Sequence, residues 1–149
     1  MSELKYRKQS HATYDCRYHI VWIPKYRYNM LEGEVAEFVK QVFEQVCKWK
    51  EIVMLQGKLR PDHVHLYLSI PPKYAVSDVV KWMKERSATQ AMRRFPEIRK
   101  RLWGGHFWAR GYFASTVGIT DDIIRRYIDN QEHQEQIEEE LNKQQTLWQ

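Results

Sequence analysis

Two histidines, His63 and His65, lie two residues apart in an otherwise apolar stretch, and two imidazoles at this spacing can act on a shared ligand. If the stretch is a β-strand, its side chains alternate, so both imidazoles share one face while Val64 and Leu66 lie on the other. Two neutral imidazoles on one face can bind the same cation, with a third ligand expected from another element. The alternative is a polar sheet face with two solvated histidines, and the pair alone does not decide between them.

A second pair, Tyr127 and Gln131, lies one helical turn apart after a helix-start signal at Thr120, whose hydroxyl can cap and is followed by two acids. At about 100° per residue, both side chains fall within the apolar arc of Ile123, Ile124 and Ile128. An inward-facing glutamine amide needs a partner, so the two residues can serve one site. Alternatively, Tyr127 is an amphipathic core residue and Gln131 bonds to backbone.

The elements that must position these residues follow the order strand, helix, hairpin, helix, strand, helix. In the first half, we expect a strand at Thr13 to Ile23, a helix from about Glu34 to Lys50, and hairpin strands at 52–59 and 63–70 around Pro61. A second helix then runs from Ser77 or Asp78 to about Phe95, and a loop follows that contains Lys100, Arg101, Gly104 and Gly105. The chain ends with an extended segment from Phe107 to Val117 and a last helix that continues into the tail and frays. This order is compatible with a ferredoxin-like α+β fold, in which an antiparallel sheet carries helices on one face, plus a C-terminal helix that carries Tyr127.

Length and composition fit one folded domain over residues 1–149, with 1–12 and 140–149 expected to be flexible ends, because 43% of the 149 residues are hydrophobic. The net charge of +5 is unevenly spread. Between Lys81 and Arg110 nine Lys or Arg face two Glu, interleaved with aromatic residues, whereas residues 131–149 hold five Glu and one Lys. This pattern predicts binding of unpaired nucleic acid; the alternative is a solvated helix face over buried aromatics. The candidate DNA-binding residues are Lys81, Lys84, Arg86, Arg93, Arg94, Arg99, Lys100, Arg101 and Arg110.

Cys16 and Cys47 stand singly, and the sequence shows neither a signal peptide nor a long apolar run. We therefore expect a cytoplasmic, reduced protein without a membrane partner.

Four motifs in order resemble the IS200/IS605 transposases, which are single-tyrosine HUH nucleases that act on single-stranded DNA. They are Tyr18-His19-Ile20-Val21-Trp22, Pro61-Asp62-His63-Val64-His65-Leu66, Arg110-Gly111-Tyr112-Phe113 with Thr116-Val117-Gly118, and Tyr127-Ile128-x-x-Gln131. Each motif is weak alone, but together they cover essentially the whole chain, roughly Thr13 to Gln134.

The resemblance implies that His63 and His65 are metal ligands, that Gln131 is the third ligand, and that Tyr127 is the nucleophile. It also implies Mg²⁺ or Mn²⁺ as the metal, although the donor set would favour Mn²⁺, Co²⁺ or Ni²⁺ on affinity. Attack by Tyr127 on a DNA phosphate would give a 5′-phosphotyrosine and a free 3′-hydroxyl, which excision and insertion of an insertion sequence require. Because a free tyrosine has a pKa near 10, local activation is needed, and the sequence does not identify the base.

The resemblance further implies a homodimer with a joined sheet, in which the tyrosine helix of one subunit completes the histidine site of the other. Its expected DNA partner is single-stranded DNA with subterminal hairpins, which would place the bound protein at the nucleoid.

Several alternatives stay open at this point. Tyr67 shares the histidine face and is a rival nucleophile, ranked lower because it is close to His65 in the chain. His19 is better explained as a packed, hydrogen-bonded histidine. A host-adopted relative that acts on palindromic repeats would keep the same residues. A non-catalytic module that binds single-stranded nucleic acid would need the basic segment and its aromatic residues, but not the combination of His63, His65, Tyr127 and Gln131. A metal-dependent small-molecule enzyme ranks third.

Overall fold

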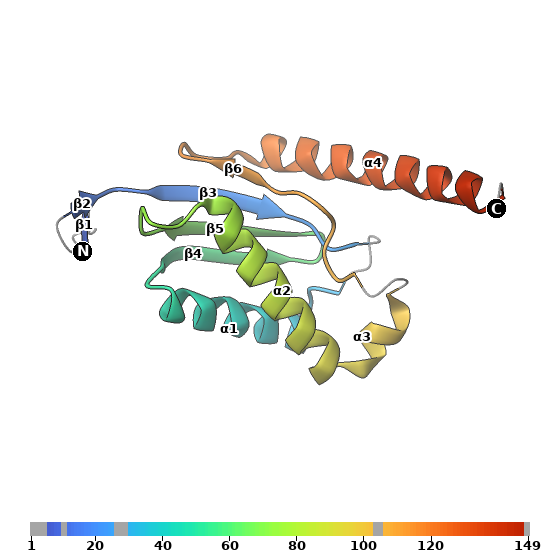
Figure 1. The fold of residues 1–149 in the computed structure, drawn as a ribbon, viewed down its shortest axis with the longest axis horizontal. Helices are drawn as coiled ribbons and strands as arrows, with labels where there is room; N and C mark the ends of the chain where they lie inside the picture. The colour runs from blue at the N-terminus through green and yellow to red at the C-terminus, as the bar shows by residue number, and fades with distance from the viewer. Residues whose placement is uncertain (1–5, 10–11, 26–29, 103–105, 148–149) are drawn as a thin grey trace.

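A computed structural model describes residues 6–9, 12–25, 30–102 and 106–147. Figure 1 shows a four-stranded sheet with helices on both sides of it and a small hairpin near the N-terminus. In chain order the elements are β1 (Arg7–Gln9), β2 (Ala12–Tyr14), β3 (Arg17–Trp22), α1 (Gly33–Trp49), β4 (Val53–Arg60), β5 (His63–Ser69), α2 (Val76–Arg94), α3 (Pro96–Arg101), β6 (Phe113–Ser115) and α4 (Asp121–Leu147).

The main sheet has the strand order β4-β5-β3-β6, and every neighbouring pair is antiparallel. Together with the helices α1 and α2 that follow β3 and β5, this order confirms the predicted ferredoxin-like α+β fold. The hairpin between β4 and β5 closes through Pro61 and Asp62, with Arg60 paired to His63. Because proline presets the backbone angle φ for a tight turn, this hairpin fixes the register that decides which face the histidines occupy.

The two faces of the sheet contribute to two separate buried clusters. Ile20, Trp22 and Leu66 point toward α1 and α2 and are fully buried in the larger cluster, where they meet residues such as Phe43 and Met83. The smaller cluster lies on the opposite face and joins α4 to the sheet. It contains Val21, Ile23, Ala109, Ile124 and Ile128. The histidine-bearing face is therefore the one that α4 partly covers.

Most predicted elements agree with the structure to within one or two residues. The last helix begins as expected, because the backbone N–H of Ile123 donates to the Thr120 hydroxyl at 3.3 Å. The residue before α2 is Ala75 rather than Ser77 or Asp78, which lie inside the helix. The chain holds no helix, within the described residues, that is long and apolar enough to cross a membrane.

Three expectations differ from the structure: the loop at Lys100 and Arg101, the single first strand, and the extended segment from Phe107 to Val117. The predicted loop at Lys100 and Arg101 belongs to the short helix α3, while Gly104 and Gly105 lie outside the described residues. The first predicted strand is divided into β2 and β3.

The segment Phe107 to Val117 forms a strand over three residues, and Trp108 makes an isolated bridge to Pro24. The cause is the Trp108 indole, which is buried and donates to the Ser87 hydroxyl of α2 at 2.9 Å, so this part of the segment packs toward the helices. The ends that we expected to be flexible include β1 and the last turns of α4.

Candidate active site on the histidine face

His63 and His65 lie on the same face of β5, partly buried, while Val64 and Leu66 between and beside them are fully buried on the other face. His63 is oriented by its neighbour in sequence, because its Nδ1 atom lies 2.8 Å from an Asp62 carboxylate oxygen. The other carboxylate oxygen accepts from Arg125 of α4 at 3.1 Å. Burial would raise the pKa of Asp62, but hydrogen bonds to and attraction by His63 and Arg125 outweigh it and hold that pKa below its ordinary value. With Nδ1 engaged, His63 presents Nε2 to a ligand.

His65 is kept neutral by its surroundings. Burial, and then the neighbouring His19, His63 and Lys58, lower the pKa of His65 to about 4. Its Nε2 atom lies 3.2 Å from Nδ1 of His19, whose own pKa is lowered by burial. A neutral imidazole keeps a lone pair for a cation, so this histidine suits a metal ligand once the contact with His19 is released.

Tyr67, the rival nucleophile, lies beside these histidines. Its ring stacks on His19 with centroids 4.1 Å apart and planes 10° from parallel. His19 thus packs between Tyr67 and His65, as expected for a packed, hydrogen-bonded histidine.

Tyr127 and Gln131 of α4 converge on Gly111. A Cβ atom at Gly111 would lie 3.7 Å from the Gln131 amide nitrogen and 3.9 Å from the Tyr127 hydroxyl oxygen. The Tyr127 ring packs near Phe113, and its hydroxyl is buried without a hydrogen-bond partner among the described residues. Burial raises the pKa of this phenol, so it stays protonated at neutral pH. The hydroxyl and the amide therefore share one environment, in which the phenol is protonated.

Lys84 of α2 holds the backbone on which this pair rests. Its ammonium donates to the carbonyl oxygens of Ala109 at 2.9 Å and of Gly111 at 2.7 Å. Burial lowers the pKa of Lys84 to about 8. We predicted Lys84 to contact DNA, but its ammonium is engaged with the loop under Tyr127, so we remove it from the proposed DNA surface.

On α4, the residue that contacts the hairpin beside His63 lies on a different side of the helix from Tyr127. Arg125, which reaches Asp62 beside His63, and Tyr127 are two residues apart and hence separated by about 200° around the helix. In addition, the described residues contain no group of three or more His, Cys, Asp or Glu arranged to hold a metal. The predicted third ligand, Gln131, lies with Tyr127 at Gly111 of the same chain.

The remaining basic residues are spread over α2, α3 and the following loop. Arg86 and Arg93 line a groove between α1 and α2, and Arg94 lies beside the Phe95 ring. The other predicted residues are exposed: Lys81, Arg99, Lys100, Arg101 and Arg110. Sequence reasoning did not identify Asp62 or Arg125. The adjacency of Asp62 and His63 was a usable signal, whereas nothing local pointed to Arg125.

Comparisons with known proteins agree on one family. The family model described as "Transposase IS200 like" matches residues 12–131. The transposase of insertion sequence element IS200 from Salmonella typhimurium is 33% identical over 133 residues, which cover 89% of this chain and 88% of that protein. The ISDra2 transposase TnpA of Deinococcus radiodurans is 35% identical over 133 residues, covering 89% of this chain and 95% of that protein.

Solved structures give the same result. A transposase crystal structure from Deinococcus radiodurans superposes with a TM-score of 0.77 at 32% identity, covering 84% of this chain and 97% of that chain. A REP-associated tyrosine transposase bound to a REP hairpin shares the fold, with a TM-score of 0.54 at 15% identity over 87% of this chain and 69% of that chain. The model match over most of the sequence, with relatives above 30% identity, shows that this chain belongs to the IS200-like transposase family.

Proposed function

We propose that this transposase cleaves and rejoins single-stranded DNA through a covalent bond between Tyr127 and a DNA 5′-phosphate. The observation that carries the proposal is the convergence of the Tyr127 hydroxyl and the Gln131 amide on one buried point at Gly111, on a fold that also presents a neutral histidine beside His63. A buried hydroxyl without a hydrogen-bond partner in the described chain is costly to keep, so its retention favours a role for the oxygen.

The chemistry is a transesterification. The phenol oxygen of Tyr127 forms a bond to phosphorus, and the bond between phosphorus and the 3′-oxygen of the preceding nucleotide breaks. The phenol gives up its proton as its bond to phosphorus forms. The electron pair of the broken bond leaves with the 3′-oxygen, which takes up one proton and becomes a free 3′-hydroxyl, so the protons balance. Attack by the 3′-hydroxyl of another strand end reverses the step and rejoins DNA, without a nucleotide cofactor.

His63, His65 and Gln131 would hold the divalent cation, Mg²⁺ or Mn²⁺. The donor chemistry fits, since His63 has Nε2 available, His65 is neutral and Gln131 offers an amide oxygen. When bound, such a cation supplies positive charge that neutralises and orients the phosphate. Two other residues of the chain position these groups: Asp62 orients His63, and Tyr127 packs beside the Gly111 backbone.

The proposed assembly is a homodimer in which α4 of one subunit completes the histidine site of its partner. Support comes from α4 itself, whose Arg125 contacts Asp62 beside the histidines of its own chain while Tyr127 lies about 200° away around the helix. The proposed substrate carries a hairpin beside the cleaved strand, and the REP-associated neighbour shows a relative of this fold bound to a hairpin. A host-adopted role is less well supported, because that neighbour is 15% identical whereas the IS200 transposase is 33% identical.

Tyr127→Phe tests the proposal directly, because it keeps the ring against Phe113 and removes the attacking oxygen. Single-stranded DNA spanning the end of the element that encodes the chain should form a covalent adduct with the wild type and none with the variant, on a denaturing gel. Tyr67→Phe serves as the matched control and should keep the adduct. An adduct that persists in Tyr127→Phe and disappears in Tyr67→Phe would transfer the role to Tyr67.

A further inference from the structure

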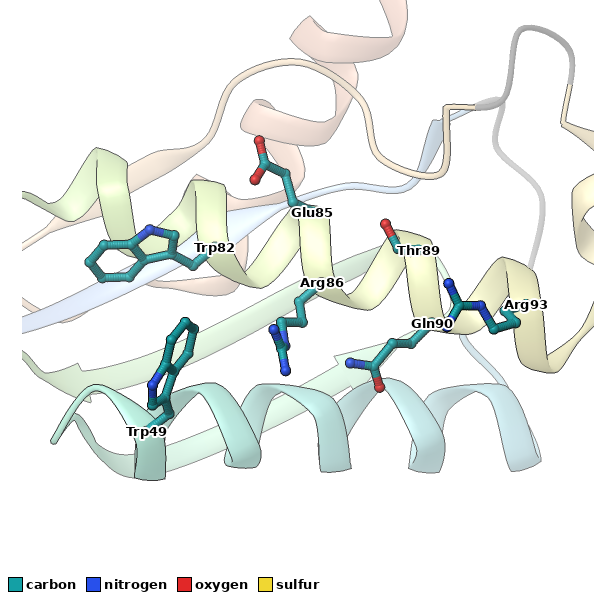
Figure 2. Close-up of a pocket in the computed structure, with 7 residues that line it drawn as sticks. All are labelled: Trp49, Trp82, Glu85, Arg86, Thr89, Gln90 and Arg93. Carbon is teal, nitrogen blue, oxygen red and sulfur yellow. The ribbon is translucent and has the colours of Figure 1, made fainter.

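The groove between α1 and α2 that Arg86 and Arg93 line is on the side of the sheet away from the histidines and is separate from the candidate active site. Its volume is about 490 Å³, within the range of pockets that hold small organic ligands. Figure 2 shows the side chains that line it along the two helices, with Arg86 and Gln90 directed from α2 toward α1. The lining residues are Trp49, Trp82, Glu85, Arg86, Thr89, Gln90 and Arg93.

The groove combines exposed aromatic surface with positive charge. The side chain of Trp49 is at the end of α1, and the residue is 61% exposed, which is unusual for so large an apolar ring. The Lys50 ammonium lies 4.0 Å from the Trp49 ring centroid and 4.3 Å from that of Trp82, and the Arg86 guanidinium lies 5.3 Å from Trp49. Arg93 adds a third positive charge to the groove, and Glu85 is the acidic residue among those that line it.

This combination matches the chemistry of a nucleotide. A flat indole surface can stack on a base, and cations within a few ångströms of it can neutralise the adjoining phosphates. In a duplex the base faces are stacked on one another, so a base that reaches Trp49 must be unpaired.

We propose that the groove binds an unpaired nucleotide of the DNA substrate, with its base stacked on Trp49 and its phosphates contacted by Lys50, Arg86 and Arg93. This inference rests on the proposed function, since it assumes a DNA substrate. Because the groove and the histidines lie on opposite sides of the sheet, the bound nucleotide is a recognition point remote from the cleaved phosphate.

Photocrosslinking locates the contact. The probe is a twelve-residue oligothymidylate that contains 5-iododeoxyuridine, irradiated with the full chain carrying Tyr127→Phe so that no covalent tyrosine adduct forms. Mass spectrometry should find the crosslink on Trp49 or Trp82. The same probe annealed to oligodeoxyadenylate should crosslink at a much lower yield, because its bases are paired.

Affinity measurements on the same probe test the energetics. Trp49→Ala should weaken binding by about 5- to 150-fold, which corresponds to the loss of one stacked base. Leu55→Ala is the matched control, because Leu55 is another exposed apolar residue, on β4, and should bind as the wild type does. Replacing both Arg86 and Arg93 by Gln should reduce the slope of log affinity against log salt by about 1.4, whereas Lys8→Gln on β1 should leave it unchanged.

Crosslinks confined to other elements, together with unchanged affinity of Trp49→Ala, would overturn the inference. The inference would also be overturned if Trp49→Ala changed the oligomeric state, measured by sedimentation, without changing DNA affinity, since the groove would then contact a second copy of the chain. Cleavage of element-end DNA by the wild type separates the two proposals. If the groove crosslinks but no cleavage occurs, the proposed function fails; if cleavage occurs without a groove contact, this inference alone fails.

Discussion

At the scale of single residues, Asp62 links the candidate metal site to the tyrosine helix. Its two carboxylate oxygens contact His63 and Arg125, so one side chain both orients a proposed metal ligand and ties α4 to the hairpin. The contact with Arg125 is exposed and contributes at most about 1 kcal/mol, because solvent screens it. The contact with His63 fixes the orientation of the imidazole.

Asp62→Asn should therefore weaken metal binding with little loss of stability. The amide keeps the size of the carboxylate but loses its charge, and loss of such an orienting partner typically costs 10- to 100-fold in metal affinity. Titration with Mn²⁺ followed by electron paramagnetic resonance measures the effect. Asp15→Asn, which alters an exposed pair with Arg17, is the matched control. Equal Mn²⁺ affinity of Asp62→Asn and wild type would remove Asp62 from the site.

Lys84 makes a prediction about pH. The pKa of Lys84 is lowered to about 8 by burial, whereas the unfolded chain has its ordinary value near 10.5. Between these values the unfolded chain binds more protons, so the contribution of Lys84 to stability rises as the pH rises from about 8 to about 10.5. The free energy of unfolding of the wild type, relative to Lys84→Met, should increase by roughly 1 kcal/mol over this window, after a reduction for partial exposure. Chemical denaturation at several pH values measures it, and a constant difference would contradict the assignment.

How far the sequence predicts these residues depends on whether their partners are local. Alternation in β5 was enough to place His63 and His65 on one face, and helical spacing was enough to pair Tyr127 with Gln131. Lys84 was assigned to DNA because its partners, the Ala109 and Gly111 carbonyls, lie 25 and 27 residues away and backbone groups leave no mark in composition.

At the scale of elements, strand and helix bounds followed from patterns that repeat along the chain. The hairpin was predictable because Pro61 and two alternating strands agree on one register. The conformation of the segment after α3 was not predictable in this way. Trp108 is buried against the helices and donates a hydrogen bond to Ser87, and a β-rich composition gives no sign of that contact.

Gly111 shows how one backbone conformation seats the tyrosine pair. Its φ of +86° lies in the region that side chains rarely adopt, while a Cβ atom there would meet Gln131 and Tyr127 at ordinary contact distances. Gly111→Ala should therefore destabilise the fold by about 1 kcal/mol or more through backbone strain rather than collision. Gly118→Ala is the matched control, because a Cβ there meets nothing within 4 Å and its φ lies outside that region. Thermal unfolding compares them, and equal stabilities of the two variants would refute the argument.

At the scale of the whole molecule, the sheet separates two surfaces with different chemistry. The histidine face is partly covered by α4, and the opposite face carries α1, α2 and their aromatic, basic groove. Figure 1 shows α4 running past the ends of the strands, consistent with a helix of 27 residues and a length of about 40 Å. Tyr127 and Gln131 lie in the first three turns of this helix, at Gly111, so a shared site would require the partner subunit to bring its histidines to this end of α4.

Mixing two inactive variants tests whether the site is shared between subunits. His63→Ala lacks a ligand but has an intact Tyr127, whereas Tyr127→Phe keeps both histidines and lacks the nucleophile. If α4 of one subunit serves the histidines of its partner, a mixed dimer holds one complete site, so the mixture should recover up to about a quarter of wild-type adduct formation when subunits exchange at random.

The count follows from the dimer: half of the randomly paired molecules are mixed, and one of their two sites is complete. If each chain used its own tyrosine, every site in the mixed dimer would lack one component and the mixture would stay inactive. Co-purification of one variant, untagged, with the other, tagged, must show that mixed dimers form. Inactivity of a mixture proven to contain mixed dimers would rule out the shared site, and Tyr127 would then have to reach the histidines of its own chain by rotation of α4, with loss of the contact between Arg125 and Asp62.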